Sequence, residues 1–253
     1  MLTIEIADFS SEGVTLTAAT APDFDARAQR ILDGRADPAL ELKPLLAIVR
    51  NRNPRTIVAY AVSFTRTLRN GMSAVDYAQF KFPDAVAGTS RGLSVLQDRE
   101  IRTGDERLIG MGFEVWPPDY AASFRDYGME AVMRLGDVQK LEIGLDAVIF
   151  EDGAILGSDR SRLSEHFIDY LLAKQSLYRD IVVGLENGTF RDDVFAPMRE
   201  ILVARPNARE SSMVRYRREA AAQVLQFRDR VLLEIFRRTL RREPFAIRRP
   251  SEM

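Results

Sequence analysis

Few residues of this 253-residue chain have the types and spacing that active-site chemistry requires. His166 is the single histidine, and the chain has no cysteine, which excludes thiolate nucleophiles, disulfides and sulfur-ligated metals. One histidine cannot build a histidine-rich metal site, although it can serve as a general base. We interpret His166 as an ordinary residue at the edge of an apolar helical stripe. We therefore predict no catalytic residues, no cofactor and no tightly bound transition metal.

Acidic residues are frequent between positions 146 and 159, a composition that calcium-binding loops share. The spacing does not fit such a loop, because the apolar Val148 and Ile149 stand where oxygen ligands are needed. The Asp152-Gly153 dipeptide instead suits a tight hairpin turn of type I′. We interpret this stretch as a turn between two strands.

The densest aromatic stretch begins at Trp116, which two prolines follow, and continues through Tyr120. Aromatic rings beside prolines can form a surface that binds peptides or sugars, and they can also plug the end of a β-sandwich. Trp116 and Tyr120 are therefore candidate interaction residues.

Arginine is concentrated near the C-terminus. Between positions 205 and 249 the chain has 13 arginines, no lysine and five carboxylates, although the net charge of the whole chain is −1. Such a segment can bind nucleic acid, an anionic membrane surface or an acidic protein surface. Because the arginines fall on several faces of a helix, we favour an acidic surface of the same chain or of a second copy.

Alternation of bulky and small residues with a period of two predicts strands within residues 41–157. The pattern occurs at 58–65, 109–115 and 141–149, with no clear helical segment between the strands. We therefore predict an antiparallel β-sandwich, immunoglobulin-like or similar. Its predicted interior residues are Tyr60, Val62, Phe113, Ile143 and Leu145. Residues 69–105 are too polar to be assigned to an element.

The segments on either side of the sandwich are predicted separately. Residues 1–40 form an N-terminal attachment with short strands at 2–6 and 14–18 and a helix at 23–32. Residues 158–243 form a helical domain, and residues 244–253 form a flexible tail. The predicted fold class is α+β: a sandwich followed by an α-helical hairpin with one long C-terminal helix.

The helix boundaries follow from capping residues. The first helix is predicted at 158–187, with Ser158 or Asp159 as its N-cap and Asn187-Gly188 at its end. A shorter helix follows near 193–204, with Pro197 near its start or at a kink. The last helix runs from about 209 to 242, which corresponds to about 50 Å at 1.5 Å per residue.

The last helix carries an apolar stripe that needs a partner surface. Its candidate interaction residues are Val224, Phe227, Val231 and Ile235, which follow helical spacing. A helix about 50 Å long is longer than a small β domain can cover, so we expect part of the stripe to contact a partner.

These observations favour a non-enzymatic protein-interaction module that self-associates or docks through its helices. One alternative is an enzyme that uses carboxylates and arginines on an unfamiliar scaffold. The other is a regulator that binds nucleic acid through the C-terminal arginines, which the near-neutral net charge makes the less favoured partner. The N-terminus lacks the basic and apolar regions of a signal peptide, and no apolar run is long enough for a membrane span, so we expect a cytoplasmic protein.

Overall fold

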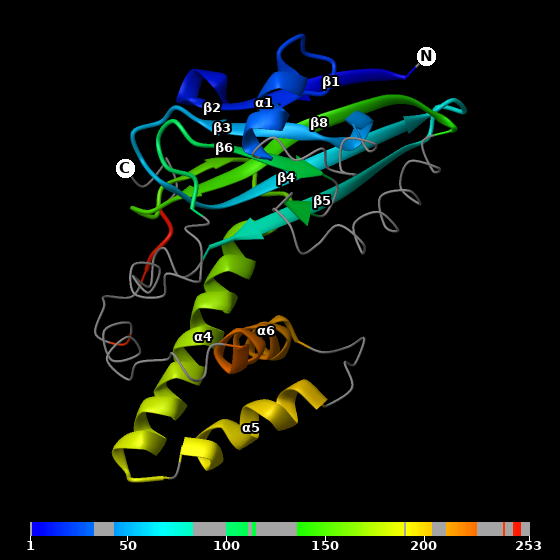
Figure 1. Ribbon diagram of the computed structural model, residues 1–253. Helices are drawn as coiled ribbons and strands as arrows, with labels where there is room; N and C mark the ends of the chain where they lie inside the picture. The colour runs from blue at the N-terminus through cyan, green and yellow to red at the C-terminus, as the bar shows by residue number, and fades with distance from the viewer. Residues whose placement is uncertain are drawn as a thin grey trace. The chain divides into compact units, whose positions relative to one another are not determined.

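The structure is a computed structural model with α+β content (Figure 1). The described residues are 2–32, 43–82, 100–110, 113–114, 136–189, 191–203, 211–226, 240 and 245–248. The chain divides into two compact units. The first unit comprises Met1–Lys81, Glu100–Leu163 and Arg248–Met253, and the second comprises Phe82–Arg99 and Ser164–Ile247.

The first unit contains a mixed sheet built around one long strand, β8 (Val138–Phe150). The strand order is β1 (Thr3–Ala7), β8, β4 (Ile57–Leu68) and β5 (Ser73–Lys81), and β9 (Ile155–Gly157) pairs with a later stretch of β8. β1 runs parallel to β8, whereas β4 is antiparallel to both of its neighbours. This sheet is therefore mixed and not purely antiparallel, because β1, from the segment predicted as an N-terminal attachment, joins it in parallel. No tight turn joins β1 to β8, and a long connection permits parallel pairing.

A second sheet of the first unit is antiparallel. Its order is β2 (Val14–Ala18), β3 (Ala47–Asn51), β6 (Glu106–Gly110) and β7 (Phe113–Glu114). A short 3-10 turn, η1 (Ser10–Glu12), links β1 to β2. Helix α1 (Phe24–Ile31) packs on this sheet, because Phe24 and Ala28 are buried together with Ile48 of β3.

Most predicted interior positions of the strands are confirmed. Tyr60, Val62 and Ile143 are fully buried, and Leu145 is 7% exposed. The side chain of Phe113 lies outside the described part. Alanines on the other face of β4, including Ala59 and Ala61, are also buried, so β4 is covered on both faces. Small side chains permit close packing on that face.

The predicted hairpin at Asp152-Gly153 is present, with a different turn geometry. The N–H of Gly153 donates to the carbonyl of Phe150 (2.9 Å), and the Phe150 N–H donates to Ala154 (2.9 Å). Gly153 has a φ of +84°, whereas Asp152 is not among the residues with positive φ. A type I′ turn needs positive φ at both central residues, so this is a three-residue loop with glycine in the left-handed conformation.

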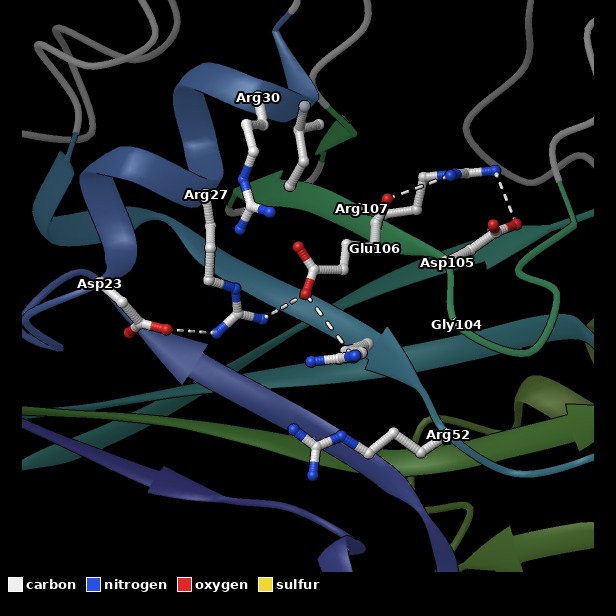
Figure 2. Close-up of a pocket in the computed structure, with 10 residues that line it drawn as sticks. Asp23, Arg27, Arg30, Arg52, Gly104, Asp105, Glu106 and Arg107 are labelled. Carbon is white, nitrogen blue, oxygen red and sulfur yellow. Dashed lines mark hydrogen bonds and ion pairs between the residues drawn. The ribbon is translucent and has the colours of Figure 1, made fainter.

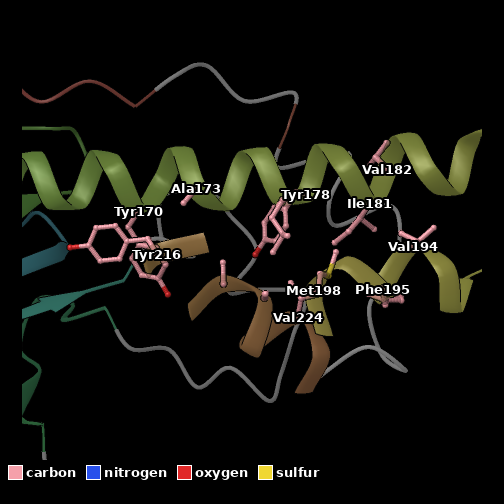
Figure 3. Close-up of a cluster of buried hydrophobic side chains, with 13 residues drawn as sticks. Tyr170, Ala173, Tyr178, Ile181, Val182, Val194, Phe195, Met198, Tyr216 and Val224 are labelled. Carbon is pink, nitrogen blue, oxygen red and sulfur yellow. The ribbon is translucent and has the colours of Figure 1, made fainter. Parts of the chain in front are cut away.

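The second unit is helical. It contains nearly all of α4 (Leu163–Glu186), together with α5 (Arg191–Val203) and α6 (Ser212–Gln226). Figure 3 shows their side chains meeting in one buried cluster, in which the rings of Tyr170 and Tyr216 lie 5.1 Å apart. The described part has three helices here, each lying largely within one of the three helical segments predicted from the sequence. The predicted pairing of two long helices as a hairpin is not confirmed, because residues 227–239 of the predicted last helix lie outside the described part. No helix of the described residues is long and apolar enough to cross a membrane.

The C-terminal end of α4 agrees with its sequence prediction. Gly188 has a φ of +75°, and its N–H donates to the carbonyl of Leu185 (3.3 Å). The N–H of Thr189 donates to the carbonyl of Gly184 (3.0 Å). These two bonds form a Schellman motif, which satisfies carbonyls that the helix itself leaves free.

The N-terminal end of α4 is different, because the helix begins at Leu163 rather than after Ser158. Residues 158–161 instead form a turn bound to the buried carboxylate of Asp146. Ser158 Oγ donates to Asp146 Oδ1 (2.9 Å), and the N–H groups of Arg160 and Ser161 donate to the same carboxylate (3.1 and 2.8 Å). The side chain of Ser158 therefore binds Asp146 of strand β8 and does not cap the helix.

Candidate functional site

A pocket of about 520 Å³ lies beside α1 in the first unit (Figure 2). Its lining residues are Asp23, Arg27, Arg30, Ile31, Arg50, Arg52, Gly104, Asp105, Glu106 and Arg107. All but Ile31 and Gly104 are charged. Five arginines face three carboxylates, so the lining has a formal charge of +2.

Helix α1 positions two of these arginines by its spacing. Phe24 and Ala28 face the second sheet and are fully buried, which fixes the rotation of the helix. Arg27 and Arg30 are three residues apart, so they project from the same side of the helix. Figure 2 shows both guanidinium groups on the helix side of Glu106.

Arg50 and Glu106 form a direct cross-strand pair between β3 and β6. Glu106 Oε1 lies 3.0 Å from Nη2 of Arg27 and 3.7 Å from Nε of Arg50. Nη1 of Arg27 also donates to Thr17 Oγ1 (2.9 Å), and it lies 3.4 Å from Asp23. The Glu106 carboxylate is therefore an internal counter-ion between two arginines.

The loop that carries Arg52 is held in place by a buried asparagine. Asn51 is fully buried, and its Nδ2 donates to the carbonyls of Arg55 (2.9 Å) and Ile101 (2.8 Å). Its backbone carbonyl accepts the N–H of Gly104 (2.7 Å). Because a buried amide with satisfied partners fixes the backbone around it, the two loops that contribute Arg52 and Gly104 form a rigid wall.

The arginines of the pocket carry more N–H donors than the described residues provide hydrogen-bond acceptors. The side chain of Arg27 is only 11% exposed, and its Nε is buried without a hydrogen-bond acceptor among the described residues. The same is true of Nε of Arg50. Arg30 and Arg52 are exposed and make no ion pair with another described residue. Guanidinium groups hold carboxylates and phosphates through paired hydrogen bonds, so this arrangement is suited to an anion.

The sequence predictions did not identify this pocket, because its residues come from three distant segments, at 23–31, 50–52 and 104–107. The local signals are the spacing of Arg27 and Arg30 and the alternation of Arg50 and Arg52. Neither signal indicates which strands are neighbours, and the pocket exists only because β3 pairs with β6 under α1.

Of the interaction residues predicted from the sequence, only Val224 lies in the described part. It is 5% exposed and belongs to the buried cluster of the helical unit. Phe227, Val231, Ile235, Trp116 and Tyr120 lie outside the described residues. His166 is partly buried, and its ring lies edge-on to Tyr216 at 6.2 Å.

Among the described residues, no three or more histidine, aspartate and glutamate side chains are grouped so that they could hold a metal ion. The carboxylate of Asp146 has a structural role, as the acceptor for the turn at 158–161. Burial opposes its ionisation, but the hydrogen bonds from Ser161, Ser158 and Arg160 outweigh burial and hold the pKa of Asp146 below its ordinary value. It is thus an ionised anchor rather than a proton donor.

The chain matches no protein-family model, no curated protein and no solved structure.

Proposed function

We propose that the chain is a non-enzymatic interaction module that holds an anionic group of its partner in the arginine-lined pocket. The observation that carries this proposal is the surplus of two positive charges in the lining. Arg30 and Arg52 supply exposed guanidinium groups that no described carboxylate neutralises. Clusters of arginine are a recurring means of binding acidic or phosphorylated groups.

The carboxylates of the pocket favour binding over catalysis. Glu106 contacts Arg27 at 3.0 Å, Asp23 contacts Arg27 at 3.4 Å, and Asp105 lies 3.9 Å from Arg107. A general base must be within reach of a substrate proton and have an available lone pair of suitable basicity. Carboxylates placed against arginines act as counter-ions, so this geometry supports a binding role more than the alternative of an enzyme.

The proposal is tested with simple anions. Sulfate and chloride are compared at constant ionic strength by thermal unfolding of the wild-type chain and of Arg52→Ala and Arg30→Ala variants. We expect sulfate to raise the unfolding temperature of the wild type and to lose most of this effect in the two variants. Arg199→Ala, in the helical unit, is the matched control because it removes an arginine that pairs with Asp192 at 3.2 Å and lies outside the pocket lining. Equal sulfate effects in all four proteins would contradict the proposal.

Self-association through the helices is the second candidate. The observation that favours it is the exposure of apolar side chains on α4 and α5: Val203 is 84% exposed, Val183 50% and Leu172 48%. Exposed apolar side chains are candidates for burial against another protein. Light scattering over a range of concentrations tests it, and a monomer at every concentration would exclude it.

We also propose that the two sheets of the first unit pack face to face as a sandwich. Ile48 is buried beneath α1, and its neighbours Ala47 and Val49, which point to the other face of β3, are fully buried as well. A second sheet on that face accounts for their burial. Replacement of Val49 with aspartate is expected to unfold the first unit. A Val49→Asp variant as stable as the wild type would contradict face-to-face packing of the sheets.

A further inference from the structure

We infer that the anion recognised by the pocket is a phosphate monoester, an inference that rests on the proposed function. The formal charge of the lining is +2, after its three carboxylates are counted against its five arginines. A carboxylate ligand or a phosphodiester brings one negative charge. A phosphate monoester brings close to two at neutral pH, so it alone among these groups neutralises the pocket.

The positions of the available arginines favour a terminal group with several oxygens. Arg30 projects from α1, whereas Arg52 projects from the loop after β3, and Figure 2 shows them on opposite sides of Glu106. A monoester has three terminal oxygens that can accept from guanidinium groups on different sides. A diester has two such oxygens and a chain that must leave the pocket in both directions.

The rest of the lining argues against recognition of nucleic acid. None of the lining residues is aromatic, and Ile31 is the single large apolar side chain among them. Proteins that bind single-stranded nucleic acid combine a basic groove with aromatic rings on which bases stack. This pocket offers the charges without the stacking surface, which suits a phosphate group and not a base.

Isothermal titration calorimetry of the full chain tests the inference with four probes. The probes are glycerol 3-phosphate, dimethyl phosphate, acetate and sulfate, each at the same ionic strength. We expect glycerol 3-phosphate to bind at least about tenfold more tightly than dimethyl phosphate or acetate, because its second negative charge makes one further charge-assisted hydrogen bond. Arg52→Ala is expected to remove this preference, and Arg199→Ala is expected to retain it.

The pH dependence provides a second readout that a general salt effect would not reproduce. The second ionisation of a phosphate monoester has a pKa of about 6, whereas arginine does not titrate in this range. Affinity for glycerol 3-phosphate should therefore fall between pH 7.5 and pH 5, while affinity for sulfate, a dianion throughout, stays constant. Equal binding of the monoester and the diester would overturn the inference and leave the proposed function intact. Binding of none of the four probes would overturn both.

The phosphate can come from a small molecule or from a phosphorylated side chain of a protein. A phosphoserine peptide and its unphosphorylated form, titrated beside glycerol 3-phosphate, distinguish these sources. Tighter binding of the phosphopeptide assigns the group to a partner protein, and tighter binding of glycerol 3-phosphate assigns it to a small molecule; both results support a monoester site. Binding of the unphosphorylated peptide or of a single-stranded oligonucleotide with equal affinity would contradict it.

Discussion

Nη2 of Arg27, on helix α1, lies 3.0 Å from Oε1 of Glu106, on strand β6. Both side chains are largely buried, at 11% and 18% exposure. The contact joins the helix to the sheet at the floor of the pocket, and it places a negative charge where the proposed ligand would bring its own. Glu106 therefore influences both the stability of the first unit and its affinity for anions.

Replacement of Glu106 with glutamine should separate these two effects. The variant is expected to lose about 1 kcal/mol of stability, because a partly screened ion pair with Arg27 and Arg50 is removed. Its affinity for sulfate should rise, since two guanidinium groups lose their internal counter-ion. Thermal unfolding with and without sulfate measures both quantities. Weaker sulfate binding in Glu106→Gln than in the wild type would show that Glu106 does not compete with the anion.

Asp146 should make stability depend on pH. Its pKa is lowered in the folded chain from an ordinary value of 3.8, so its contribution is present above that value and is lost as the pH falls toward the folded pKa. Asp146→Asn should cost about 1–3 kcal/mol of stability at pH 7, because the donors at Ser158, Arg160 and Ser161 lose their charged acceptor. Urea unfolding from pH 7 to pH 2.5 should show this difference shrinking below about pH 4.

The control for Asp146 is Asp152→Asn, since the side chain of Asp152 is 49% exposed. We expect this substitution to change stability by less than about 0.5 kcal/mol. A pH-independent difference between Asp146→Asn and the wild type would mean that the carboxylate charge is not what holds the turn.

Gly157 and Gly71 form a matched pair for testing close packing at the end of β9. Both have positive φ, +95° and +82°. A Cβ at Gly157 would clash with the carbonyl oxygen of Asp146 and would lie 2.6 Å from Cζ of Phe9, whereas a Cβ at Gly71 meets nothing within 4 Å. We expect Gly71→Ala to cost about 1 kcal/mol from the backbone alone, and Gly157→Ala to cost several times more. Chemical denaturation measures both, and equal losses would contradict the predicted clash.

Val224 and Val203 test where the helical unit has its core. Val224 is 5% exposed within the cluster around Tyr216, whereas Val203 is 84% exposed at the end of α5. Val224→Asp would bury an unpaired carboxylate, and it should cost about 3 kcal/mol or more. In a monomer, Val203→Asp should change the free energy of unfolding by less than about 0.5 kcal/mol. If Val203→Asp instead dissociates an oligomer, light scattering will detect it, and the self-association proposal gains support.

Local sequence patterns predicted the secondary-structure elements whose conformation depends on nearby residues alone. The alternation at 58–65 and 141–149 falls within β4 and β8, and the prediction of Asn187-Gly188 as the end of α4 is confirmed by its hydrogen bonds. The strand predicted at 14–18 has the bounds of β2. In each case, neighbours within a few residues fix the conformation.

Features that depend on distant segments were not predicted. β5 lies within 69–105, which the sequence left unassigned, because Val75 and Tyr77 are exposed on an edge strand and give no buried pattern. The start of α4 was misplaced because Asp146, 12 residues before Ser158, removes that serine from the helix. The pocket was missed for the same reason: Arg50 and Glu106 become neighbours only through the pairing of β3 with β6.

The pairing of β1 with β8 has a consequence for protein synthesis. β1 ends at Ala7, and its hydrogen-bonded neighbour in the sheet is completed only at Phe150. A ribosome adds about 5–20 residues per second, so the newly made N-terminal strand waits on the order of ten seconds for this neighbour. During that interval its backbone is an open edge that other chains can pair with. A nascent chain that stalls before Phe150 would therefore be a natural client for a ribosome-associated chaperone.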